Sequence, residues 1–411
     1  MSTNGCENAN YEKKVSLRED LANILLNFPL MWFLLTMGTG VTAVVLQNLP
    51  FKFSGLDVIT HIIIIFNLVL FGVILLLTIA RYSMWPELVR LTMMHPTEIL
   101  FLGPFSMSIS MFVNYGALAL AKRWSFAFSI FIWVLWWIDI VVALCILAGI
   151  LFLQFTRHTN ELKGYNALRL FPVVCVIVAS ATGGIVSSIV PLEHAKLTIN
   201  VSWVTFGIGF SVGMMIFVTY FVRLTLHNHP SGNYVFSAFL PLGVCGQSSF
   251  VVLKLSSSAR NLFVKHGEWL TSPNIFSKHS HGIMADALVA FSIPTGLFLW
   301  GFAFVWLFLA IFVVIDVARI SRIPFSLSWW GMTFPLAAFA LATSELATVL
   351  ASGFFRVFAT VFILIEVIIW LSVIFLTAYN IPRKSFHVAP CVKDNAVTLQ
   401  TIRSQGYQNI K

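Results

Sequence analysis

Three observations predict an all-α membrane protein with ten transmembrane helices arranged as five helical hairpins. The 411 residues are 58% hydrophobic and only 10% charged, and their mean hydropathy is +0.89. Soluble domains carry about 25% charged residues, so a soluble enzyme, a disordered chain and a secreted disulfide scaffold are excluded. The apolar residues also gather in runs long enough to cross about 30 Å of hydrocarbon, and these runs lack the two-residue alternation of barrel strands.

The apolar runs define ten expected spans joined by mostly short connections, so successive helices are expected to be antiparallel neighbours. A polar segment, residues 1–15, precedes the first span without a cleavable signal, and we expect the first span itself to target the chain to the membrane. The expected spans are residues 29–49, 59–79, 99–120, 124–155, 169–190, 197–222, 234–255, 284–318, 325–346 and 354–380.

The positive charge predicts how the spans are oriented. With both termini in the cytoplasm, 16 of the 25 Lys and Arg residues fall on the cytoplasmic side and 9 on the other side. Residues 16–19 (SLRE) form a capping box, and the apolar residues after it recur at helical spacing, as in a helix that lies on the membrane surface. The expected parts are a cytoplasmic tail with this amphipathic helix (1–27), the transmembrane domain (28–380) and a second cytoplasmic tail (381–411).

Helix breakers are concentrated in the odd-numbered spans. Proline removes a backbone hydrogen bond and bends a helix, and the freed carbonyls are tolerated only beside protein or a water-filled cavity. We therefore expect kinked odd-numbered helices to line a central pore, with smoother even-numbered helices facing lipid. Close packing of small residues is the alternative explanation. The breakers and small polar residues expected at this pore are Thr39 and Gly40 in the first span, Pro104 in the third, Pro172 in the fifth, Pro241, Gln247 and Ser248 in the seventh, and Thr333 and Pro335 in the ninth, whereas the even-numbered spans have only Pro294.

Ionisable residues inside the expected spans are costly and usually functional, and four of them stand out. Asp139 and Glu366 lie near the middle of the fourth and tenth spans, and Glu345 lies near the end of the ninth. Each acid is either a hydrogen-bonded structural residue or a proton-binding group that couples transport to pH. Lys254, near the end of the seventh span, either extends its amine to the interface or forms a positive rim that attracts anions.

The sequence contains no pattern typical of a cofactor, a metal, nucleic acid binding or catalysis. The five cysteines include no CxxC pair and are interpreted as small packing residues. The longest expected loop, residues 256–283, holds His266, His279 and His281. His279 and His281 are two residues apart, as in a metal or pH-sensing pair, but no carboxylate or cysteine lies at ligand spacing beside them, which favours a solvated loop. No acidic ring lies in the odd-numbered spans, which argues against a cation channel. Neutral donors, helix N-termini and the basic surplus favour an anion as substrate.

Several segments resemble the tellurite-resistance/dicarboxylate transporter family, which includes slow anion channels, malate permeases and fungal sulfite efflux pumps. Residues 329–336 (WWGMTFPL) are similar to its ninth-span signature, and residues 37–40 (MGTG) to its first-span signature. The resemblance is greatest to the sulfite efflux pumps. It rests there on residues 95–96 (HP), 100–103 (LFLG), 135–139 (LWWID), 241–247 (PLGVCGQ) and 344–346 (SEL).

The resemblance implies a pore lined by the odd-numbered helices and a small inorganic or organic anion as substrate, with the lipid bilayer as the surroundings. It identifies Phe334 with the phenylalanine that occludes the pore in channel members of the family. A bulky ring beside a proline, here Pro335, can close a narrow pore and move when the helix flexes. Because some relatives are trimers, the resemblance also implies a homo-oligomer.

The leading hypothesis is export of sulfite or hydrogensulfite across a fungal plasma membrane. A C4-dicarboxylate (malate) permease and a gated chloride or nitrate channel are the alternatives. The chain departs from the sulfite efflux pumps at Val244, where they usually carry proline, and at Ser248, where they usually carry glycine. These departures keep the malate carriers in consideration.

Overall fold

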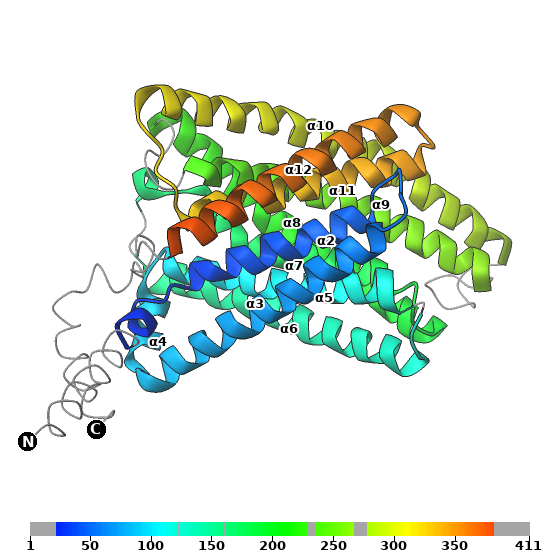
Figure 1. Cartoon of the computed structure of the whole chain (residues 1–411). Helices are drawn as coiled ribbons and strands as arrows, with labels where there is room; N and C mark the ends of the chain where they lie inside the picture. The colour runs from blue at the N-terminus through cyan, green and yellow to red at the C-terminus, as the bar shows by residue number, and fades with distance from the viewer. Residues whose placement is uncertain (1–21, 122, 159–160, 228–234, 267–277, 382–411) are drawn as a thin grey trace, which may run out of the picture.

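The computed structural model of the chain describes residues 22–121, 123–158, 161–227, 235–266 and 278–381. Within them, ten helices are long and apolar enough to cross a membrane, which confirms the predicted number of spans (Figure 1). The predicted capping box at residues 16–19 and the side chains of His279 and His281 lie outside the described residues.

Each odd-numbered span begins with a short 3₁₀ segment that continues as an α-helix, whereas each even-numbered span is one continuous α-helix. The odd-numbered spans are η1 (Leu30–Trp32) with α2 (Phe33–Gln47), η2 (Glu98–Phe101) with α5 (Leu102–Tyr115) and the π-helical η3 (Gly116–Leu120), η5 (Ala167–Leu170) with α7 (Phe171–Val186), η6 (Val235–Phe239) with α9 (Leu240–His266), and η7 (Leu327–Met332) with α11 (Thr333–Val349). The even-numbered spans are α3 (Leu56–Met84), α6 (Phe126–Thr156), α8 (Leu192–His227), α10 (Lys278–Ile320) and α12 (Gly353–Asn380).

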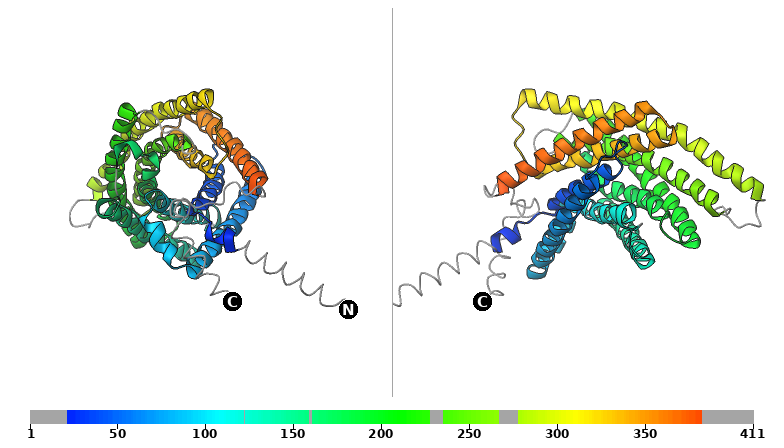
Figure 2. Two further views of the ribbon diagram at one scale, coloured as in Figure 1. Left: turned by 90° about the vertical axis from the view of Figure 1, so that its left-hand side faces the viewer. Right: turned by 45° about the vertical axis from the view of Figure 1, so that its right-hand side comes forward.

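The odd-numbered spans form a closed inner ring, in which α2 contacts α5, α5 contacts α7, α7 contacts α9, α9 contacts α11, and α11 returns to α2. An outer layer surrounds this ring when the molecule is viewed along its axis (Figure 2). Each outer helix packs on its own hairpin partner and on the next inner helix; α6, for example, lies between α5 and α7. The predicted five hairpins with inner odd-numbered helices are therefore confirmed.

Burial separates the two layers. In the most apolar 18-residue stretch of each inner span, 78–100% of the residues are buried, against 22–33% in each outer span. Large apolar side chains such as Leu76, Phe155 and Phe298 are exposed on the outer helices. These side chains match the hydrocarbon of a bilayer, so the outer layer forms the lipid-facing surface.

The prolines of the inner spans lie at the 3₁₀-to-α junctions rather than in the middle of the spans. Pro104, Pro172, Pro241 and Pro335 occupy the second or third position of their α-helices. The first turn of a helix needs no backbone N–H, so proline is tolerated there without breaking the helix. The prolines therefore mark the point at which each of these spans changes from a 3₁₀ segment to an α-helix. Pro294 is different, because it lies inside α10.

The connections differ from the prediction at three places. The expected loop at 256–283 is much shorter, because α9 continues to His266 and α10 begins at Lys278. Hydropathy marks only the part of a helix that lies in lipid, whereas backbone hydrogen bonding carries these helices beyond it. The connection before the third span contains an additional helix, α4 (Glu87–Met94), which buries Leu88 against Leu26 and Trp85. A short 3₁₀ turn, η4 (Leu162–Gly164), lies before the fifth span.

Candidate functional site

The ring contacts of α11 define which way its residues face. A Cβ atom added to Gly38 of α2 would lie 2.6 Å from the Thr333 Oγ1 atom, so Thr333 faces α2 at close range. A Cβ atom added to Gly243 of α9 would lie 3.4 Å from Pro335, so Pro335 faces α9. The residues directly before and after Phe334 therefore contact the two neighbouring inner helices, Thr333 contacting α2 and Pro335 contacting α9.

The outward side of α11 is marked by Phe339. Its ring centroid lies 5.4 Å from that of Trp300 on α10 and 5.0 Å from that of Phe362 on α12. Because an α-helix turns roughly 100° per residue, Phe334 lies roughly 140° around α11 from Phe339. The Phe334 ring therefore lies on the side of α11 that faces the interior of the inner ring, where it is 1% exposed.

Gln247 and Lys254 lie on the corresponding side of α9. Ser249 donates a hydrogen bond of 2.8 Å to the backbone carbonyl of Gly296 and thereby marks the side of α9 that faces α10. Gln247 lies roughly 160° from Ser249, and Lys254 lies seven residues, or roughly two turns, beyond Gln247 on the same side. Gln247 is 3% exposed, and among the described residues its Oε1 atom has no hydrogen-bond partner. The hydroxyl of Ser248 likewise lacks a partner there.

The structure brings Lys254 and Glu345 together at the far end of the ring, away from the 3₁₀ segments. The Lys254 Nζ atom lies 3.6 Å from Glu345 Oε2, and Ser257 donates a hydrogen bond of 3.1 Å to Glu345 Oε1. Glu345 follows Phe334 by eleven residues, which places it on the same side of α11 about 16 Å further along the helix. Sequence reasoning named both charges without predicting that they form a pair.

Thr39 and Gly40 lie at contacts between helices. Trp370 of α12 donates a hydrogen bond of 3.2 Å from its Nε1 atom to Thr39 Oγ1. A Cβ atom added to Gly40 would lie 2.7 Å from the Cβ atom of Met111 on α5. The structure therefore turns both residues toward neighbouring helices, and their expected part in a pore stays a prediction.

The two mid-span acids come from outer helices and contact inner ones. Asp139 of α6 accepts hydrogen bonds from Ser106, at 2.8 Å, and from Ser110, both on α5. Glu366 of α12 accepts a hydrogen bond of 2.8 Å from Thr42 of α2. Both acids are fully buried. Each carboxyl group thus joins an outer helix to an inner one, and neither lies on the inner ring itself.

The interior of the ring is closed and apolar at the level of Phe334. The serines of α5 face α6 and α2, so the helical turn directs Met107 and Met111 inward. On α2, the hydroxyls of Thr36 and Thr42 contact α5 and α12. On α7, the Ser180 hydroxyl contacts α8. The opposite sides of α2 and α7 therefore face the interior of the ring. The inward-facing residues at this level are 0–2% exposed: Met37, Val41, Met107, Met111, Val174, Val178, Phe334 and Ala338.

Sequence reasoning missed two buried charges of the inner spans, both at the end of the ring where the 3₁₀ segments lie. Glu98 of η2 is 0% exposed and accepts a hydrogen bond of 2.9 Å from the backbone N–H of Leu30. Arg169 of η5 is 8% exposed, and its guanidinium carbon lies 4.5 Å from the centroid of the Tyr165 ring. The available signal was a charged residue at the start of a predicted inner span, because Arg169 is the first residue of 169–190 and Glu98 directly precedes 99–120.

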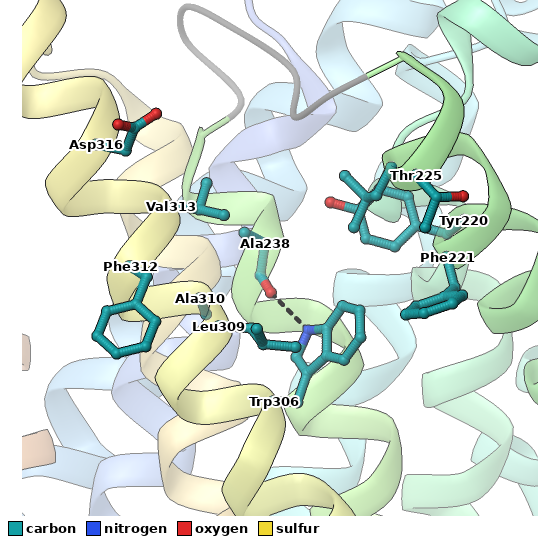
Figure 3. A pocket seen from close by; sticks show the side chains of 11 residues that line it. Tyr220, Phe221, Thr225, Ala238, Trp306, Leu309, Ala310, Phe312, Val313 and Asp316 are labelled. Carbon is teal, nitrogen blue, oxygen red and sulfur yellow. Dashed lines mark hydrogen bonds between the residues drawn. The ribbon is translucent and has the colours of Figure 1, made fainter.

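A groove of about 430 Å³ lies outside the ring, between α8 and α10 (Figure 3). Its wall carries Trp306, whose Nε1 atom donates a hydrogen bond of 3.0 Å to the backbone carbonyl of Ala238 in η6. In a 3₁₀ segment that carbonyl would pair with the residue three positions later, which here is Pro241 and has no N–H. Trp306 thus replaces the missing donor, and the groove belongs to the lipid-facing surface.

Comparison with known proteins agrees with this architecture. Residues 27–378 match the family described as voltage-dependent anion channel. A sulfite efflux pump of Arthroderma benhamiae is 33% identical over 90% of this chain and 94% of its own length. A sulfite efflux pump of Candida albicans is 26% identical over 82% of this chain and 69% of its own length. A malic acid transport protein of Schizosaccharomyces pombe is 23% identical over 87% of this chain and 79% of its own length.

The family match extends from before the first span to within two residues of the end of the tenth, in agreement with the predicted ten-span membrane protein. The predicted resemblance to the fungal sulfite efflux pumps is confirmed by relatives that align over nearly their whole length. The chain belongs to the voltage-dependent anion channel family and is a multi-pass anion transporter.

Proposed function

We propose that this transporter exports sulfite or hydrogensulfite across the plasma membrane, along a path through the inner ring that Phe334 closes. The observation that carries the proposal is the sealed apolar narrowing around Phe334, with a polar amide and a cation further along the same interior. The identity of 33% to a sulfite efflux pump, over 94% of its length, supports sulfite as the substrate.

The residues beyond the narrowing suit an anion. Gln247 offers amide N–H groups, which replace part of the water around an anion. Lys254 adds a positive charge that Glu345 holds in place and partly neutralises, which favours passage of an anion over tight binding. The first turns of the five inner α-helices all lie at one end of the ring, where their partial positive charge adds to this preference.

The gate follows from the position of Phe334 in the first turn of α11. The 3₁₀ segment η7 precedes it directly, and Pro335 follows it. Such a junction lacks part of the regular hydrogen bonding, so a small rotation there moves the ring without unfolding the helix. We infer that rotation at this junction opens the path.

The orientation rests on the distribution of basic residues, of which 16 lie on the side of the termini and 9 on the other. We therefore place both termini and the 3₁₀ segments in the cytoplasm. Substrate then enters at the 3₁₀ segments and leaves beyond Lys254. We also propose a homo-oligomer, which light scattering of the purified protein in detergent tests.

The second candidate is transport of a C4-dicarboxylate such as malate, which the similarity to a malic acid transport protein over 87% of the chain favours. Proteoliposomes loaded with sulfite separate the two candidates. Under our proposal sulfite efflux is saturable and an excess of malate leaves it nearly unchanged. Strong malate flux without sulfite flux would favour the dicarboxylate carrier, and large currents that do not saturate would favour a chloride or nitrate channel.

A further inference from the structure

A second hollow lies between α8 and α10, in the half of the molecule that carries Lys254, and α9 forms its floor. We call it the outer recess; its volume is about 420 Å³. It is separate from the groove of Figure 3, because Phe217 of α8 lies between the two and packs on Phe302 and Trp306 of α10, with ring centroids 5.3 and 4.9 Å apart. The apolar side chains in the wall of the outer recess are Trp203, Phe206, Val252, Leu288 and Phe291.

The floor of the outer recess carries the hydroxyl group of Ser256 on α9. Ser256 is 0% exposed, and among the described residues its Oγ atom has no hydrogen-bond partner. The other two hydroxyls in the wall differ, because Ser292 donates to the backbone carbonyl of Val289 at 2.8 Å and Thr295 donates to that of Phe291 at 2.9 Å. A buried hydroxyl without a partner is unfavourable, so Ser256 favours a ligand that brings a matching polar group.

The helical positions around Ser256 show that it faces the gap between α8 and α10. Val252, one turn earlier, lines the recess, and Ala259, nearly one turn later, is buried in a cluster with Ala195 of α8 and Ala285 of α10. Lys254 lies roughly 200° around the helix from Ser256, on the side that faces the interior of the ring. A ligand in the outer recess therefore reaches α9 from the lipid side without entering the interior of the ring.

The outer recess has a polar end and an apolar end. Arg260, one turn beyond Ser256, forms an ion pair of 2.7 Å with Asp286 of α10, and both side chains are exposed. Because exposed charges belong at the aqueous edge of a bilayer, the Ser256 hydroxyl lies just inside that edge, roughly 6 Å along the helix from Arg260. In the other direction, Val252 and Thr295 extend the recess toward the middle of the membrane.

We propose that the outer recess binds a membrane sterol, whose hydroxyl pairs with Ser256 and whose fused rings lie along the aromatic wall. A sterol carries one hydroxyl at the end of a rigid apolar body, which matches one buried hydroxyl at the aqueous end of an apolar recess. None of the described residues that line the recess is charged, so a phosphate headgroup would find no opposite charge in the wall. The volume of about 420 Å³ falls within the range of about 300–1,000 Å³ of small-molecule sites.

A sterol at this place also contacts the turn of α9 that holds the charged pair. Ser257, directly after Ser256, donates a hydrogen bond of 3.1 Å to Glu345 Oε1, and Lys254 Nζ lies 3.6 Å from Glu345 Oε2. A rigid ligand packed on Ser256 restricts the motion of this turn. Because a ligand that binds the folded protein stabilises it, sterol raises the unfolding temperature.

The test is photolabelling of the purified protein in detergent with a cholesterol analogue that carries a diazirine on its rings, followed by mass spectrometry of the labelled peptides. We expect label on α8 and α10 beside the outer recess, with free cholesterol as a competitor. Ser256→Ala weakens the competition by cholesterol about 2–10-fold, the range of one lost hydrogen bond. Ser258→Ala is the matched control, because its hydroxyl donates to the backbone carbonyl of Gly184 on α7 at 2.8 Å, outside the recess, and we expect wild-type competition from it.

A second variant tests the shape of the recess. Thr295→Phe fills the inner end of the recess, and we expect it to abolish the label while the protein stays folded. Equal competition by cholesterol in Ser256→Ala and Ser258→Ala, or full labelling of Thr295→Phe, would overturn the sterol site. Competition by a phosphatidylcholine as strong as that by cholesterol would assign the recess to a phospholipid, and labelling of the monomer alone would assign it to a contact with a second copy of the chain; either result would overturn the proposal.

Discussion

Replacing Phe334 with alanine tests the gate most directly. The ring is 1% exposed and faces the interior of the inner ring, so its removal leaves an open volume in the path. A buried aromatic side chain covers about 150–250 Å², and at about 25 cal/mol per Å² its packing contributes about 4–6 kcal/mol. That energy is the upper limit for the barrier that the ring adds to anion passage.

A rate changes about ten-fold for each 1.4 kcal/mol of barrier. If only a third of the packing energy of Phe334 opposes opening, Phe334→Ala raises anion flux by at least about ten-fold. The assay is the initial rate of sulfite efflux from proteoliposomes, normalised to the amount of reconstituted protein. The variant also loses stability, by about 3–5 kcal/mol if the protein does not close around the gap.

Phe339→Ala is the matched control, because Phe339 is also fully buried on α11 but faces Trp300 and Phe362. It loses similar stability without opening the path. We therefore expect a lower unfolding temperature in both variants but a higher flux only in Phe334→Ala. Phe334 is not the gate if Phe334→Ala transports at the wild-type rate, or if Phe339→Ala raises flux equally.

Three further predictions address the ionisable residues of the spans and their partners. Asp139→Asn lowers the free energy of unfolding by about 1–3 kcal/mol, because an amide is a weaker acceptor than a carboxylate for the hydroxyls of Ser106 and Ser110. The pH dependence of flux stays unchanged. Loss of that dependence would identify Asp139 as a proton carrier instead. Lys254→Ala leaves the Glu345 carboxylate without its neutralising cation and lowers flux at low anion concentration about five-fold, whereas Glu345→Gln does not lower it. Equal initial rates in the two variants would rule out a role of Lys254 as a positive rim that attracts anions. Thr42→Val removes the hydroxyl that donates a hydrogen bond to Glu366. It lowers the unfolding temperature without changing which anions are transported. A changed anion preference in a competition assay would contradict a purely structural role of the Thr42–Glu366 hydrogen bond.

The layered fold was predictable from the sequence because hydropathy and the placement of breakers report on the surroundings of each helix. The outer spans face lipid on one side, and their sequences are continuous apolar runs, as in α3. The inner spans are buried on every side and accommodate hydroxyls such as those of Thr36 and Ser108, which form a hydrogen bond of 2.8 Å with each other. The prolines correctly identified the inner layer. Their exact effect was not predictable, because the same proline bends a helix in its middle and begins one in its first turn.

The candidate site was only partly predictable. Asp139 was visible as an acid at bilayer depth, but its partners lie on α5, about 30 positions earlier in the chain, and no local pattern reveals them. The pairing of Lys254 with Glu345 depends on how α9 and α11 align in the ring. Thr39 shows the same limit, because a hydroxyl in an inner span points either into the ring or toward an outer helix, and a contact with Trp370 decides which.

Anion passage through the inner ring is the central claim. The most direct measurement is efflux of sulfite from proteoliposomes that contain the wild type, Phe334→Ala or no protein, with malate, chloride and nitrate as competitors. We expect saturable sulfite efflux from the wild type, faster efflux from Phe334→Ala, and little competition by the other anions. Efflux equal to that of empty vesicles in both the wild type and Phe334→Ala would contradict the account.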